Sequence, residues 1–126
     1  MPDIETETRH AGSFGRADMY LIKAGHSYAD ITYRPETSWF SIAHVHVDPD
    51  ARGKGVSEVL LRQSVVLAES LDASTIYGVL VSREMIDACV TVFGEDAVQV
   101  DRPGNYSSPS ERPHLDAHAT LRVERQ

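Results

Sequence analysis

The sequence has only one cysteine, Cys89, and no long apolar run. A single cysteine excludes an internal disulfide and makes a reducing cytoplasm the expected compartment. A transmembrane helix needs about 18 consecutive apolar residues and is therefore excluded. Residues 1–8 are acidic and polar, unlike a secretion signal. We expect a cytoplasmic protein that does not enter a membrane.

Positive charge is also scarce, because 12 Lys and Arg stand against 19 Asp and Glu. Nucleic-acid binding draws its affinity from clustered Lys and Arg, so no nucleic-acid partner is expected. The formal net charge of −7 favours a cationic acceptor through long-range attraction. The same charge also keeps a small protein in solution, and both explanations stay open.

The 126 residues suffice for one domain with a core. Residues 1–17 show no sustained apolar period and carry Gly12 and Gly15, which predicts a mobile N-terminal arm. The pattern becomes regular from Asp18. We therefore place a single domain at residues 18–126.

Periodicity predicts the elements of this domain. Residues 19–23, 27–34 and 39–47 indicate three strands joined by short turns, an antiparallel meander. The period then changes to that of an amphipathic helix at residues 55–71. The further expected elements are a strand at 74–81, a helix from the N-cap Ser82 to Gly94, and strands at 97–100 and 117–123. This order predicts an α/β (α+β) fold with a mixed, mostly antiparallel sheet and helices on both faces.

The most informative motif is the glycine-rich turn at residues 52–57, between a strand and a helix. A helix N-terminus has unpaired amides and partial positive charge, and so it binds phosphate. Gly53 and Gly55 let the backbone approach a ligand, and Arg52 and Lys54 add positive charge. The turn therefore predicts a pyrophosphate site, against the alternative of a purely structural turn.

Two known phosphate loops do not fit this turn. The spacing G-x-x-x-x-G-K-[ST] does not occur in the chain, which excludes the nucleotide-triphosphate loop. The dinucleotide fingerprint G-x-G-x-x-G needs glycine where the chain has Glu58.

Residues 45–61 resemble the acetyl-CoA-binding motif of the Gcn5-related N-acetyltransferases, the GNAT family. In that pattern a strand ends in V-x-P and is followed by [Q/R]-x-x-G-x-[G/A] at the start of a helix. Arg52, Gly55 and the small Ser57 take the patterned positions. The resemblance extends from Met19 to Val123 by the order of elements.

The resemblance implies transfer of an acetyl group from acetyl-CoA to a primary amine, either a small amine or a protein lysine or α-amine. The strand backbone at Val45, His46 and Val47 would bind the pantetheine arm. The amides of the turn would hold the pyrophosphate. The residues of this turn are Arg52, Gly53, Lys54, Gly55, Val56 and Ser57.

Two departures from the family pattern bear on catalysis. The first strand and two helices of the family have no counterpart expected before Asp18, so the acceptor binds a more open surface or one completed by a second subunit in a homodimer. Val90 stands where the family has a tyrosine that protonates the departing thiolate. Val90 and the absence of a carboxylate from the strand before the turn support the alternative of a non-catalytic acyl-CoA-binding or protein-interaction module.

The candidate bases are His44 and His46, because imidazole ordinarily titrates at about pH 6.5. Strand alternation predicts both on the face shared with Ile42. The resemblance implies a base at Ser41 or Ala43. These positions alternate with His44 and His46 along the strand, so they are expected on the opposite face.

Tyr77 and the loop residue Tyr106 are candidates for the missing acid, and Cys89 is expected to be a buried structural thiol. The six histidines are scattered, so no metal site is expected.

Overall fold

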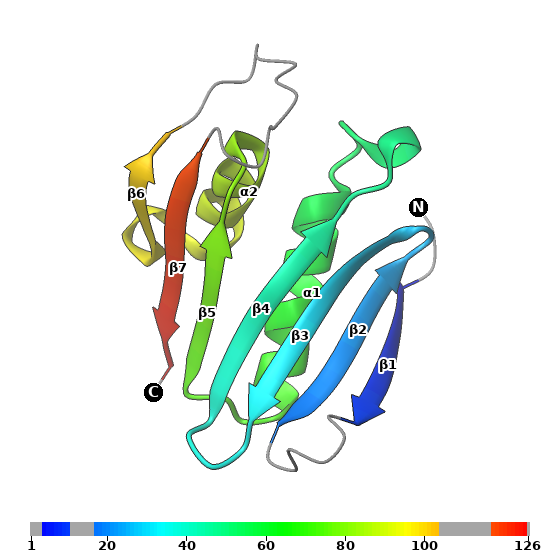
Figure 1. Cartoon of the computed structure of the whole chain (residues 1–126), viewed down its shortest axis with the longest axis vertical. Coiled ribbons are helices and arrows are strands. Elements are labelled where there is room, and N and C mark those ends of the chain that lie inside the picture. Colours follow the sequence, from blue (N-terminus) through cyan, green and yellow to red (C-terminus); the bar gives the residue numbers. More distant parts are fainter. Residues whose placement is uncertain (1–3, 11–16, 104–116, 126) are drawn as a thin grey trace.

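The computed structural model describes residues 4–10, 17–103 and 117–125. These residues form a seven-stranded sheet and two α-helices (Figure 1). The strands are β1 (Ile4–His10), β2 (Asp18–Ala24), β3 (Ser27–Arg34), β4 (Trp39–His46), β5 (Thr75–Leu80), β6 (Val98–Arg102) and β7 (His118–Glu124). The helices are α1 (Val56–Ser70) and α2 (Arg83–Phe93), with short 3₁₀ turns at Pro49–Ala51 and Glu95–Ala97.

The strand order across the sheet is β1-β2-β3-β4-β5-β7-β6. Only β4 and β5 pair in parallel, and every other neighbouring pair is antiparallel. The predicted meander is confirmed as β2, β3 and β4, and the predicted mixed, mostly antiparallel sheet is confirmed as a whole. Gly25 provides the positive φ, 64°, of the tight turn between β2 and β3.

Residues 4–10, which we expected to belong to a mobile N-terminal arm, form the edge strand β1. It pairs with β2 in unbroken antiparallel register, from Ile4 opposite Ala24 to His10 opposite Asp18. Its residues alternate weakly because charged side chains, such as Glu7, occupy one face, as is common for edge strands. The ammonium of Lys23 bonds the Glu7 carboxylate at 2.7 Å. The first strand that the family resemblance implies is therefore present.

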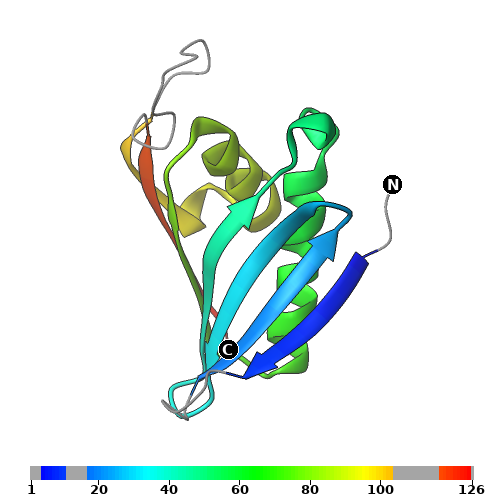
Figure 2. The ribbon, with the colours of Figure 1, turned by 45° about the vertical axis from the view of Figure 1, so that its right-hand side comes forward.

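Both helices lie on one face of the sheet, which corrects the expectation of helices on both faces. Helix α1 contacts β2, β3 and β4, whereas α2 contacts β6 and β7, and the two helices contact each other. Figures 1 and 2 show both helices behind the sheet. The crossovers from β4 to β5 and from β5 to β6 run in the same direction across the sheet, so right-handed connections place both helices on the same side.

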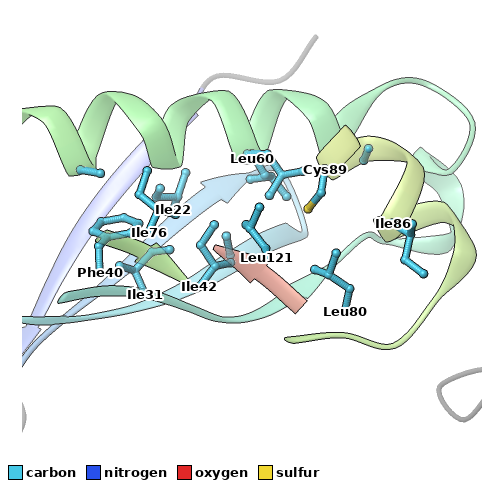
Figure 3. Packing of buried hydrophobic residues seen from close by; sticks show 14 of the residues in the cluster. Ile22, Ile31, Phe40, Ile42, Leu60, Ile76, Leu80, Ile86, Cys89 and Leu121 are labelled. Atoms are coloured by element: carbon cyan, nitrogen blue, oxygen red, sulfur yellow. The ribbon is translucent and has the colours of Figure 1, made fainter. Parts of the chain in front are cut away.

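The core fills the space between this face and the helices. In β3, alternate residues from Ser27 to Tyr33 are buried, as period two requires. Leu60 of α1 and Cys89 of α2 are fully buried and point towards Ile42 and Leu121 of the sheet (Figure 3). We call the opposite side, which neither helix covers, the open face.

The ends of α2 follow the sequence signals. The Ser82 hydroxyl accepts a bond from the Met85 amide at 3.2 Å, so the predicted N-cap is confirmed. Gly94 ends the helix with φ 94°, and its amide donates to the Val90 carbonyl. No helix in the described part of the chain is long and apolar enough to cross a bilayer.

The burial of Cys89 gives the first prediction. Loss of hydration raises the pKa of this thiol from 9.0 to about 12. We expect its reaction with an aromatic disulfide reagent in mildly alkaline buffer to be slower than in the urea-unfolded chain by more than about 100-fold. Equal rates in the folded and unfolded chains would contradict the burial.

The same thiol makes stability depend on pH. Above pH 9.0 the unfolded chain loses the thiol proton, whereas the folded chain retains it up to a pH of about 12. The free energy of unfolding of the native chain should therefore fall over this interval more steeply than that of Cys89→Ala, measured by urea titration.

Candidate functional site

The strands β4 and β5 separate at the end of the sheet where α1 begins. Their parallel ladder runs only from Trp39 opposite Thr75 to Ile42 opposite Gly78. Figure 1 shows the two strands diverging beyond this point. The backbone of residues 43–46 on this edge therefore has no partner in β5.

A β-bulge in β4 lies at the point of separation. Ile42 is opposite Ile31 and His44 is opposite Asp30, so Ala43 is an extra residue in β4. An extra residue bends its strand and increases the local twist. The bulge thus accounts for the turn of β4 away from β5.

A cavity of about 330 Å³ lies between the diverging strands. Residues of both sheet faces line it: Leu61, Met85 and Cys89 belong to the helix layer, whereas His44 and Val79 belong to the open face. Because both faces contribute, the cavity passes between the strands. Its lining is mainly apolar.

A larger groove of about 670 Å³ adjoins this cavity. It runs between the glycine-rich turn and α2, and it shares Val45, Val81, Ser82 and Met85 with the cavity. The two hollows therefore adjoin each other, and together they extend from the start of α1 to the gap between β4 and β5; we call them the path.

The glycines of the turn are required by their backbone conformation. Gly53 and Gly55 both have φ 77°, in the left-handed region that other residues rarely adopt. A Cβ atom at either position would meet no atom within 4 Å. Space for a side chain is thus present, and only the positive φ favours glycine.

The N-terminus of α1 is open to an anion. Gly55 occupies the N-cap position, where no side chain bonds the first-turn amides. These amides belong to Val56, Ser57 and Glu58, which all line the groove. Val56 is buried and anchors the turn to the core. The exposed Arg52 lines the groove beside them, and these groups together suit a phosphate.

Carboxylates oppose this positive field. Glu58, Glu84 and Asp87 also line the groove. The Asp87 carboxylate is 3.4 Å from the guanidinium of Arg83, one turn earlier in α2. The attraction for an anion therefore comes chiefly from the backbone of the turn and from Arg52.

The prediction that His44 and His46 share the face of Ile42 is wrong. His44 lies opposite Asp30 and His46 lies opposite Tyr28, both on the open face. The Tyr28 ring centroid is 6.0 Å from that of His44 and 5.3 Å from that of His46. The bulge at Ala43 shifts the alternation by one residue and moves both imidazoles to the other face.

This shift brings His44 to the face of Ser41, where the family resemblance implied a base. Ser41 is opposite Thr32, which alternates with the buried residues of β3. His44 is exposed and lines the cavity between the strands, whereas the half-buried His46 lines the groove. The catalytic roles of both histidines remain predictions.

The other candidates lie in different surroundings. Tyr77 is on the open face, where its ring centroid is 5.2 Å from that of Trp39, and it lines neither hollow. Val90 is half-buried and packs against the core. Tyr106 lies outside the described residues.

Among the described residues, no group of three or more His, Cys, Asp and Glu side chains converges as a metal site would require. The His118 ring nitrogen Nδ1 is instead 2.9 Å from an Asp101 carboxylate oxygen on the neighbouring strand.

The sequence patterns did not identify the side of the site that Val81 and Met85 form. Val81 and Met85 line both hollows from the end of β5 and the start of α2. The exposed Val79 and Val81 were an available signal, because apolar residues at the end of a central strand are usually covered.

No family model matches the sequence, and a search of curated proteins also finds no match. Solved structures do match. A Bacillus subtilis acetyltransferase in complex with CoA is 11% identical with a TM-score of 0.60, over 98% of this chain and 100% of that one. A GNAT family acetyltransferase from Elizabethkingia anophelis with acetyl-CoA bound is 12% identical with a TM-score of 0.59, over 98% and 99%.

The ribosomal-protein-S18-alanine N-acetyltransferase from Escherichia coli is 12% identical with a TM-score of 0.58, over 97% of this chain and 94% of that one. Identities this low show the fold alone. Together with the mixed sheet and its two crossover helices, these similarities show that the chain has the fold of the GNAT superfamily of acetyltransferases.

Proposed function

We propose that this protein is an N-acetyltransferase that moves an acetyl group from acetyl-CoA to a primary amine. The observation that carries the proposal is the path, the two adjoining hollows that extend from the amides of α1 to the gap between β4 and β5. One end suits a pyrophosphate, and the middle offers an unpaired strand edge. The other end opens beside a histidine on the open face.

Each part of the path has a function in this proposal. The amides of Val56, Ser57 and Glu58 and the side chain of Arg52 hold the pyrophosphate. The backbone of residues 43–46 bonds the pantetheine arm as a further strand would. The acetyl thioester then lies in the cavity beside His44.

The chemistry follows from this placement. His44 takes a proton from the acceptor ammonium, directly or through water, because only a neutral amine attacks a thioester. The amine nitrogen forms a bond to the carbonyl carbon, and a strand amide stabilises the oxyanion. The nitrogen loses its second proton to water as the carbon–sulfur bond breaks. CoA leaves as a thiolate, which takes up a proton from water because Val90 supplies none.

Two observations favour a second candidate, a non-catalytic acyl-CoA-binding or interaction module. Val90 packs against the core and lines neither hollow. β4 also carries no carboxylate. A protein that bound acetyl-CoA and released no free CoA with any amine in a single-turnover assay would be this module.

The turn gives a prediction for binding. Gly55→Val places a β-branched residue at φ 77°, which costs about 1–3 kcal/mol or forces the turn to rearrange. Either outcome moves the amides of α1, so affinity for acetyl-CoA should fall by about tenfold or more, measured by titration calorimetry.

The matched control is Gly94→Val at the end of α2. Gly94 also has a positive φ, 94°, with no atom within 4 Å of an added Cβ, and it lines neither hollow. This variant should lose similar stability and retain its affinity. Retained affinity in Gly55→Val would refute the phosphate site.

The position of His44 gives a prediction for catalysis. His44→Ala should lower the rate of acyl transfer by about 10²-fold or more, because the acceptor ammonium then loses its proton to solvent alone. Its affinity for acetyl-CoA should stay unchanged. His46→Ala, on the same face but against the groove, should retain the rate. An unchanged rate in His44→Ala would exclude this residue as the base.

A further inference from the structure

The open face beside the cavity carries a cluster of polar and aromatic side chains from β3 and β4. Asp30 lies directly opposite His44, and Tyr28 lies directly opposite His46. Cβ atoms of opposed residues on antiparallel strands are about 5 Å apart. Four side chains thus lie close together on the open face, and one of them, His44, lines the cavity.

Asp30 is a carboxylate without a partner in the described part of the chain. Its neighbour on the other side is the apolar Leu21 of β2. The cation at the diagonal position in β2 is Lys23, whose ammonium bonds Glu7 of the edge strand at 2.7 Å. Asp30 is half-exposed and therefore remains available to a cation from solution.

Tyr28 adds a second group that attracts cations. Its ring lies near both imidazoles, with its centroid 6.0 Å from that of His44 and 5.3 Å from that of His46. The ring is half-buried and keeps part of its surface exposed. An ammonium within about 6 Å of an aromatic centroid is attracted to the ring face. The carboxylate and the ring thus favour the same kind of ligand.

Asp30 and Tyr28 lie on the side of the sheet that faces away from the helix layer. Within the described residues, both helices pack on the opposite face. A small ligand therefore has a route to Asp30 that does not cross the helix layer.

We propose that Asp30 and Tyr28 bind a second cationic group of the acceptor, so that the preferred acceptor is a di- or polyamine. The inference rests on the proposed acetyl transfer. The reacting amine lies at the cavity mouth beside His44, and the second ammonium lies at Asp30. The net charge of −7 attracts such a ligand from a distance.

The first test compares 1,4-diaminobutane with 1-aminobutane, which lacks the second charge. The native protein should have a kcat/KM at least about tenfold higher for the diamine. Asp30→Asn should raise KM for the diamine by about tenfold, with little change in kcat. It should leave the monoamine kinetics and the affinity for acetyl-CoA unchanged.

Asp96→Asn is the matched control, because it removes one negative charge from an exposed position in the 3₁₀ turn Glu95–Ala97. It should not alter the preference between the two amines. Equal kcat/KM for both amines, or equal effects of Asp30→Asn on both, would overturn the inference and leave the acetyl transfer intact.

A binding experiment separates the two proposals further. Adding 1,4-diaminobutane to the CoA-loaded protein should shift the imidazole NMR signals of His44, and Asp30→Asn should abolish the shift. If no amine is acetylated, the proposed function fails and this titration alone decides the cation site. No shift in the native protein would refute the site.

Discussion

The candidate site depends on one extra residue in β4. Ala43 interrupts the register with β3, and the ladder between β4 and β5 ends directly before it at Ile42. The bulge bends β4 away from its parallel neighbour β5, and the cavity lies in the gap between the two strands. The same residue reverses the alternation, so that His44 reaches the open face. Without the bulge, the strand would continue its pairing and direct this imidazole into the core.

At the N-terminus of α1, the attraction for an anion comes more from the backbone than from side chains. The amides of α1 and Arg52 attract an anion, whereas Glu58 and Glu84 repel one. Backbone amides keep their positions only while the turn keeps its shape, and that shape rests on the positive φ of Gly53 and Gly55. The affinity of such a site thus depends on the conformation of two glycines, at which an added Cβ atom would meet no other atom within 4 Å.

The sequence predicted the elements that rest on strong local signals. The Ser82 cap, the Gly94 stop and the periodic helices all describe interactions within a few residues. The bulge could not be predicted, because it is defined by the pairing of β4 with β3. The sequence of β4 by itself contains no signal for the extra residue. The strand β1 was missed for a related reason: an edge strand buries little, and its charged residues weaken the apolar alternation.

Polar residues on the open face allow that side of the sheet to contact water. No helix of the described residues packs on it. The open-face positions of β3 carry Tyr28, Asp30 and Thr32, which water hydrates, while the intervening residues build the core. Antiparallel sheets tolerate one solvated face, so the strands need no second layer of helices. Apolar residues also lie on the open face, namely Met19 and Leu21 of β2 and Val79 of β5, and of these Val79 lines the cavity. An apolar wall beside His44, next to the hydrated carboxylate of Asp30, suits a ligand with a hydrocarbon chain between charged ends.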